Sequence, residues 1–212
     1  MQQADILIHQ IHDHEKENKF FLSQLPKELR EINSRFIRME DRCRHSTGKY
    51  LLKTLLGQHG FSQEKLNSMD FGKSDKPFIP GTFHFNISHS GEMVVCAASM
   101  DCIVGIDVEH IHKVNIKLLQ TKFTPNENQI INSSDDPMDT FFEFWSRKES
   151  VIKADGRGIS MGLQKVDVSE LQVRHPGKES WFLFPLNIKS DYKMCLCANN
   201  QNISIRMEWL KI

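Results

Sequence analysis

The sequence predicts an α+β fold made of two similar α/β halves, each an antiparallel sheet with packed helices. Short segments of alternating or continuous apolar residues, typical of strands, are interleaved with longer segments whose apolar residues recur at helical spacing. In addition, residues 191–199 resemble residues 90–98, since each segment is a turn followed by an apolar strand. This repeat predicts a pseudo-twofold arrangement of residues 1–104 and 105–212. Because ligand sites are common between such units, we expect an active site at the seam.

In the first half, two helices and three strands are predicted. One helix begins at Pro26, and a second helix ends near Gly57 or Gly60. The apolar stripes of these helices are Leu29, Ile32 and Phe36, and then Leu51, Leu52, Leu55 and Leu56. Strands are predicted at residues 6–8, 83–87 and 93–98, with a hairpin turn at Gly91 joining the last two.

The second half begins with a strand at residues 103–109 and continues with helical segments around Leu118 and at residues 127–131. The strongest helix follows Pro137, covers residues 138–154 and ends at Gly156. The tail is rich in predicted strands, at residues 166–168, 181–184, 194–198 and 203–209.

The strand at residues 103–109 carries two acids on one side. Its residues alternate, so Asp107 and Glu109 point the same way, about 7 Å apart along the strand. Two such carboxylates repel each other unless a cation or solvent separates them. Gly105, on the same side, is expected to keep the approach clear for a bulky ligand. On the strand alone, an edge strand with solvated acids is the alternative.

Glu149 and Lys153 lie four residues apart on the strongest predicted helix, on one face with Trp145. A Glu–Lys pair at this spacing is usually a surface ion pair worth roughly 0.3–0.5 kcal/mol. In isolation the pair is therefore consistent with a structural role, and the pattern alone does not indicate chemistry.

Composition argues against several classes of protein. The 212 residues include 27 Lys and Arg and 27 Asp and Glu, so no net charge favours nucleic acid or an anionic membrane. With no basic leader and no long apolar segment, we expect a cytoplasmic protein without a membrane partner, acting as a monomer. The five cysteines form no CxxC pair, which favours reduced, buried thiols over a zinc site or a disulfide framework.

Three segments, taken together, resemble the signature of the 4′-phosphopantetheinyl transferases. They are FNISHS at residues 85–90, GIDVE at residues 105–109 and WSRKESVIK at residues 145–153. The length and the two similar halves are those of the larger, surfactin-type class. The chain departs from the family before Lys76, where Asp75 replaces a frequent glycine.

The resemblance implies transfer of phosphopantetheine from coenzyme A to a serine of an apo acyl or peptidyl carrier protein, releasing adenosine 3′,5′-bisphosphate. It also implies Mg²⁺, which binds carboxylates together with substrate phosphates and water and neutralises charge on a pyrophosphate. The metal ligands that it implies are Asp107, Glu109 and Glu149.

The resemblance assigns further roles to individual residues. Glu149 would also be the general base, directly or through a water, and Lys153 would contact a phosphate of the transition state. The residues expected to bind the phosphates of the coenzyme are Arg44, Lys76, Ser88 and His89.

The carrier protein is expected to dock on residues 112–123, where three lysines could meet an acidic surface and Leu118 or Leu119 could supply apolar contact. A solvated helix face is the alternative for this segment. Two alternatives for the whole chain are a metal-dependent nuclease and a non-catalytic module that binds carrier proteins. The neutral charge argues against the first, and the complete set of three acids argues against the second.

Overall fold

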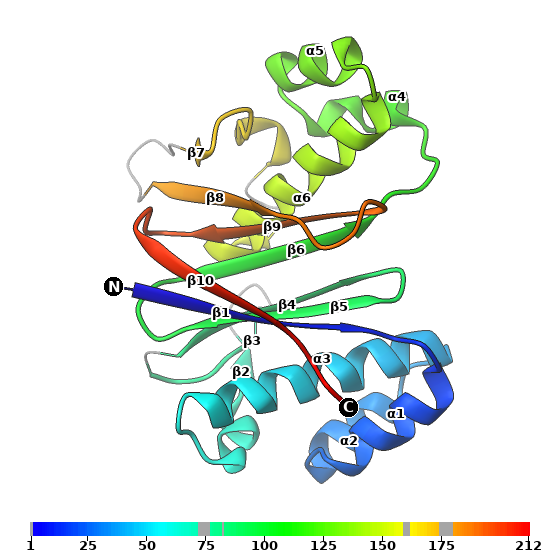
Figure 1. The fold of residues 1–212 in the computed structure, drawn as a ribbon, viewed down its shortest axis with the longest axis vertical. Helices are drawn as coiled ribbons and strands as arrows, with labels where there is room; N and C mark the ends of the chain where they lie inside the picture. Colours follow the sequence, from blue (N-terminus) through cyan, green and yellow to red (C-terminus); the bar gives the residue numbers. More distant parts are fainter. Residues whose placement is uncertain (1, 72–76, 82, 159–161, 174–179) are drawn as a thin grey trace.

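Two four-stranded sheets form the centre of the molecule, each with helices on its outer face (Figure 1). The computed structural model describes residues 2–71, 77–81, 83–158, 162–173 and 180–212. Among these residues, no helix combines the length and the apolar content needed to span a lipid bilayer.

The first sheet has the strand order β10-β1-β5-β4. Its strands are β1 (Gln2–Gln10), β4 (His84–Ser90), β5 (Met93–Ser99) and β10 (Ile203–Trp209). Strand β5 pairs antiparallel with β1 and β4, whereas β10 pairs parallel with β1. Three helices cover its outer face, namely α1 (His14–Ser23), α2 (Lys27–Ser34) and α3 (Met39–Gln58). Between α3 and β4 come the short elements η1 (Gln63–Ser68), β2 (Asp70–Phe71) and β3 (Pro77–Phe78).

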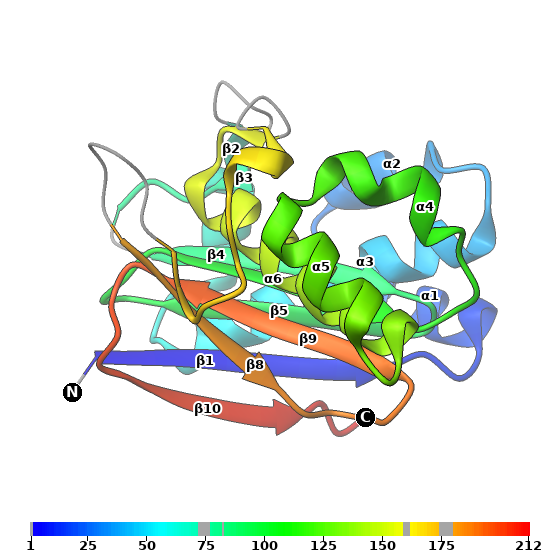
Figure 2. The same cartoon turned by 90° about the horizontal axis from the view of Figure 1, so that it is seen from above.

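The second sheet has the strand order β6-β9-β8-β7 and is antiparallel throughout. Its strands are β6 (Val104–His110), β7 (Gln172–Val173), β8 (Trp181–Leu186) and β9 (Tyr192–Ala198). The long helix α6 (Pro137–Asp155) crosses β6 and β9, and α5 (Pro125–Ser133) packs on α6 (Figure 2). The remaining elements are α4 (Ile116–Leu119), η2 (Gln120–Lys122) and η4 (Leu163–Lys165).

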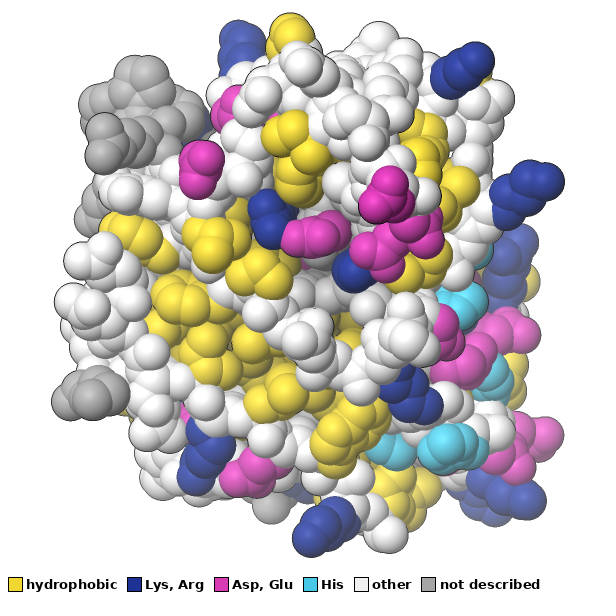
Figure 3. Space-filling model, turned by 45° about the horizontal axis from the view of Figure 1, so that its top comes forward, with side chains coloured by type: hydrophobic (Ala, Val, Ile, Leu, Met, Phe, Trp, Pro, Cys, Tyr) yellow, Lys and Arg dark blue, Asp and Glu magenta, His cyan; other side chains and the backbone are white. Residues whose placement is uncertain are grey.

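The inner faces of the two sheets share one apolar core. Alternate side chains of β1 and β5, such as Ile6 and Val95, meet alternate side chains of β6 and β9, such as Ile106 and Leu196. The intervening side chains of each strand enter a separate core under the helices of that half. Both faces of each central strand are therefore buried. At the open edge, apolar side chains reach the surface, including Met207 and Trp209 of β10, and Figure 3 shows apolar side chains gathered on this side of the molecule.

The predicted fold class is confirmed, because the structure contains two α+β halves with helices packed on two largely antiparallel sheets. The last strand adds a link that was not expected. Although it follows residue 105, β10 completes the sheet of the first half, where its Ile203 and Ile205 cover the shared core. The boundary between residues 104 and 105 stays a prediction.

Several local predictions need correction. The first strand spans nine residues instead of three, and α1 was not expected, because its apolar residues are few among charged ones. Residues 166–168 do not form a strand. Their backbone is bound by side chains of neighbouring helices instead, as when Val168 N donates to Glu127.

Candidate active site

Strands β4 and β6 run side by side at the seam and are joined by side chains. Asn86 Oδ1 accepts from the backbone N–H of Ile106 at 2.9 Å. The hydroxyl oxygens of Ser88 and Ser90 accept from the N–H groups of Val108 and His110, at 3.3 and 3.1 Å. Because strand residues alternate, the other N–H groups of β6 face β9. These three contacts, which we call the side-chain ladder, fix the first half against the second.

Asp107 lies at this seam and is only 2% exposed. Helix α6 covers it, and Gly105 explains how the helix comes so close. A Cβ atom at Gly105 would overlap the backbone of Ser150 and Ala154. The expectation that Gly105 leaves room for a ligand, like the alternative of a solvated edge strand, is therefore wrong. The glycine makes room for the helix.

Lys153 crosses from α6 to the strands. Its Nζ lies 2.6 Å from Asp107 Oδ1 and 2.7 Å from Ser88 Oγ, and Ser88 Oγ donates to Asp107 Oδ1 at 3.0 Å. The alternative of a surface ion pair along the helix is wrong, because the ion pair of Lys153 is with Asp107. The contacts bring together one residue from each of three elements.

Three carboxylates surround this lysine and resist ionisation. Burial raises the pKa of Asp107, which the charge of Lys153 opposes. Burial and then the charge of Asp107 raise the pKa of Glu109 to about 7 and also raise the pKa of Glu149. These three acids around Lys153 would be stabilised by a further cation.

The donor set fits the implied magnesium ion. Within the described residues Asp107 Oδ2 is buried without a hydrogen-bond partner, so one carboxylate oxygen is available for a ligand. Among the described residues, no three His, Cys, Asp or Glu side chains lie close enough together to hold a metal ion by themselves. That spacing is compatible with Mg²⁺, which usually takes only one or two carboxylates and completes its shell with water and substrate phosphates.

Ser88 and His89, which were expected to bind phosphates together, point to opposite faces of β4. Ser88 is buried on the face that looks into the core between the sheets, opposite Val95, whereas His89 is exposed on the other face, the side of α3, opposite Val94. The expectation that His89 projects into the seam is wrong, since strand alternation turns it toward α3. The bonds of Ser88 to Asp107 and Lys153 favour a positioning role, and its contact with coenzyme stays a prediction.

The other expected phosphate ligand on this side is Arg44 of α3. It donates to Gly91 O at 2.9 Å and pairs with Asp41 at 3.1 Å, which places it at the turn that follows β4. Burial, then the charges of Arg44 and Lys153, lower the pKa of His89. His89 and Arg44 therefore lie close together beside the seam, and without an anion the imidazole is favoured in its neutral form. Lys76 lies outside the described residues.

The segment predicted to dock the carrier protein, residues 112–123, lies on the surface of the second half. Its three lysines, Lys113, Lys117 and Lys122, are exposed, and so is Leu118, at 76%. Leu119 instead packs on the core under α6. Docking on this segment stays a prediction.

Other residues of the site were not singled out by the sequence. Asn86 and Ser90 belong to the side-chain ladder, and Ser90 Oγ also donates to Glu109 at 2.8 Å. The sequence did contain a sign of their role, because a polar residue at every second position of a strand indicates a face that meets other polar groups.

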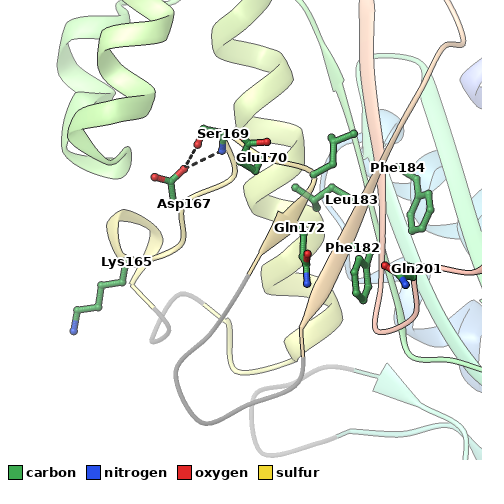
Figure 4. Close-up of a pocket in the computed structure, with 10 residues that line it drawn as sticks. Lys165, Asp167, Ser169, Glu170, Gln172, Phe182, Leu183, Phe184 and Gln201 are labelled. Atoms are coloured by element: carbon green, nitrogen blue, oxygen red, sulfur yellow. Dashed lines mark hydrogen bonds between the residues drawn. The ribbon is translucent and has the colours of Figure 1, made fainter.

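A separate pocket of about 870 Å³ lies beside β7 and β8 (Figure 4), and none of its lining residues belongs to the predicted site.

Comparison with known proteins agrees with this geometry. A family described as "4'-phosphopantetheinyl transferase superfamily" matches residues 103–204, and "4'-phosphopantetheinyl transferase, N-terminal" matches residues 12–101. The chain is 31% identical over 195 residues to 4'-phosphopantetheinyl transferase Sfp of Bacillus subtilis (strain 168), covering 87% of this chain and 86% of that protein. It is 35% identical over 194 residues to 4'-phosphopantetheinyl transferase psf-1 of Bacillus pumilus, with 86% and 82% covered.

Two family models, one for each half, together with these relatives define the chain as a transferase. The chain belongs to the 4′-phosphopantetheinyl transferase superfamily. Within it, the chain is of the larger, surfactin-type class, as the similarity to the Bacillus enzymes over most of the chain shows.

We predict that Gly105→Ala destabilises the protein by about 1–3 kcal/mol or more, as overpacking does, because the added methyl meets backbone atoms of α6. Thermal unfolding measures the effect. Gly57→Ala is the matched control, since a Cβ there meets nothing within 4 Å and alanine favours the helix. Equal melting temperatures for the two variants would contradict the close approach of α6.

We also predict that Glu109 makes stability depend on pH. Its pKa in the folded state, about 7, is above the ordinary 4.5, so the folded protein binds this proton more tightly than the unfolded chain. The favourable contribution is complete below pH 4.5 and is lost as the pH rises through 7. Glu109→Gln should therefore gain stability over the wild type as the pH rises from 5 to 8, by up to about 3 kcal/mol. Unfolding at both pH values checks this, and a difference independent of pH would contradict it.

Proposed function

We propose that this protein transfers the 4′-phosphopantetheine arm of coenzyme A to a serine of an apo acyl or peptidyl carrier protein, releasing adenosine 3′,5′-bisphosphate. The observation that carries the proposal is the cluster of Asp107, Glu109, Glu149 and Lys153 at the seam. A pyrophosphate is highly charged, and its cleavage requires positive charge and a proton acceptor at the same place.

Lys153 is suited to contact the reacting phosphate. An ammonium group has three N–H donors, and within the described residues two of them bind Asp107 and Ser88. The third can donate to a phosphate oxygen while the other two hold the side chain in place. The pyrophosphate bond to the adenylate breaks as the serine oxygen attacks, and Lys153 stabilises the charge that develops.

Glu149 is the proposed general base. Burial and the charge of Asp107 raise its pKa when no cation is bound, and a bound cation would favour the ionised form that accepts a proton. It would take the proton of the carrier serine directly or through a water. A Mg²⁺ ion held among Asp107, Glu109 and Glu149, by one or two of these carboxylates directly and by the others through water, would supply the remaining positive charge to the pyrophosphate.

The test is incubation with coenzyme A, MgCl₂ and several apo carrier proteins, followed by intact-mass measurement of the carrier. We expect the mass of a phosphopantetheine group to be added to one serine, and we expect none in excess chelator. Unmodified carriers under all conditions would overturn the proposal. Transfer in the presence of chelator would overturn the metal assignment alone.

We predict that Glu149→Gln loses kcat by at least about 100-fold, the lower range for a positioned general base. The amide occupies the same space but neither accepts the proton nor carries charge. Steady-state kinetics with varied coenzyme A separates the two parameters. A loss confined to KM would contradict the role in the chemical step.

We predict that His89 reads the 3′-phosphate of the coenzyme, a group remote from the reacting bond. It is directed toward α3 and away from the seam, beside Arg44. Wild type should prefer coenzyme A over dephospho-coenzyme A by roughly 1.5–3 kcal/mol, the scale of a charged hydrogen bond. His89→Ala should lose much of this preference, mainly through KM. An equal loss toward both coenzymes would contradict the assignment.

A further inference from the structure

Lys148, directly before Glu149, is entirely buried. Its Nζ lies 2.7 Å from Glu127 Oε2, and neither side chain has any exposed surface. The same Nζ donates to Leu163 O at 3.0 Å and to Val166 O. All three N–H donors of this lysine are therefore used inside the protein. It cannot contact the substrate from this position.

Glu127 extends these contacts to other segments. Its Oε2 accepts from Thr124 N at 2.7 Å, which completes the cap of α5, and its Oε1 accepts from Val168 N at 2.8 Å. The ring of Phe123 lies 5.5 Å from Lys148 Nζ. The pair therefore joins α6 to the start of α5 and to the loop that surrounds η4.

A buried ion pair such as Glu127–Lys148 contributes little to the free energy of unfolding, so a gain in stability does not by itself explain it. Removing two charges from water costs several kcal/mol for each, and well-packed apolar residues of similar volume are often as stable or more stable. What a fully bonded pair provides is a defined geometry, because the lysine must reach three fixed acceptors at once. The pair therefore limits both sliding and rotation of α6.

The opposite side of α6 is fixed as well. Ser150 and Ala154 lie against Gly105, and Lys153 is bound to Asp107. Glu149 therefore lies between Lys148, which is bound to Glu127, and Ser150, which lies against Gly105. A small shift of α6 would move Glu149 and Lys153 together, and a misplacement of about 1 Å can cost roughly 100-fold in rate.

We infer that Glu127 and Lys148 are positioning residues for the transfer reaction: their buried ion pair holds α6 so that Glu149 and Lys153 are aimed at the seam. The inference rests on the proposed function. It assigns to a lysine of the WSRKESVIK segment a role without substrate contact, and it adds Glu127, which lies outside the three signature segments.

The test compares a variant that removes the ion pair with a control variant that alters the core of the same helix. Glu127→Gln/Lys148→Met removes both charges together, so that no unpaired charge remains buried. Phe142→Leu, a core substitution in the same helix, is the control for loss of stability, because Phe142 is 3% exposed and its ring packs on His112 and Phe141, which belong to neither charge network. Melting temperature, kcat and KM for coenzyme A are measured for each, well below the melting temperatures.

We expect kcat of the double variant to fall 10- to 100-fold, on the scale of a misplaced catalytic group, with KM for coenzyme A little changed, while the control keeps the wild-type kcat. Wild-type kcat in the double variant would overturn the inference, and so would an equal kcat loss in the control. If the double variant does not fold, Glu127→Asp decides, since it keeps both charges but shortens the reach by one methylene. Inactive wild-type protein would instead refute the proposed function.

Discussion

The side-chain ladder between β4 and β6 is the interaction on which the site depends. Two sheets that shared only an apolar core could slide past each other, because apolar contact has no direction. Hydrogen bonds that Asn86, Ser88 and Ser90 accept from backbone N–H groups of β6 set one register instead. In that register Ser88 also reaches Asp107 and Lys153. The hydroxyl of Ser88 thus takes part both in the ladder that aligns the two halves and in the contacts that position Asp107 and Lys153.

Helix α6 brings the remaining chemistry to this register. It lies so close to β6 that only glycine fits at residue 105, and this closeness buries Asp107 and raises the pKa of its neighbours. The same burial would be unfavourable in a protein that bound nothing there, since desolvated carboxylates repel. The carboxylates are therefore stabilised by the positive charge of Lys153 and would be stabilised further by the proposed metal ion.

Much of this arrangement was predictable from the sequence, and the rest depends on tertiary contacts. Alternation correctly placed Asp107 and Glu109 on one side of their strand, and periodicity found the long helix. Alternation also places Ser88 and His89 on opposite faces, although motif reading grouped them. The ion pair of Lys153 with Asp107 and the contact of Gly105 with α6 depend on how α6 crosses β6, and no local sequence pattern predicts that crossing. The pairing of Lys148 with Glu127 likewise joins different helices.

The parallel pairing of β10 with β1 has a consequence for how the chain is made. Gln2 pairs with Ile203, so the first strand of the protein waits for the last before its sheet is complete. Until then β1 has an unpaired edge, which is a template for pairing with another chain. During synthesis the first half is therefore exposed to misassociation until residues 203–209 have left the ribosome. Such long-range closure also slows folding, because the loop must close before its contacts form.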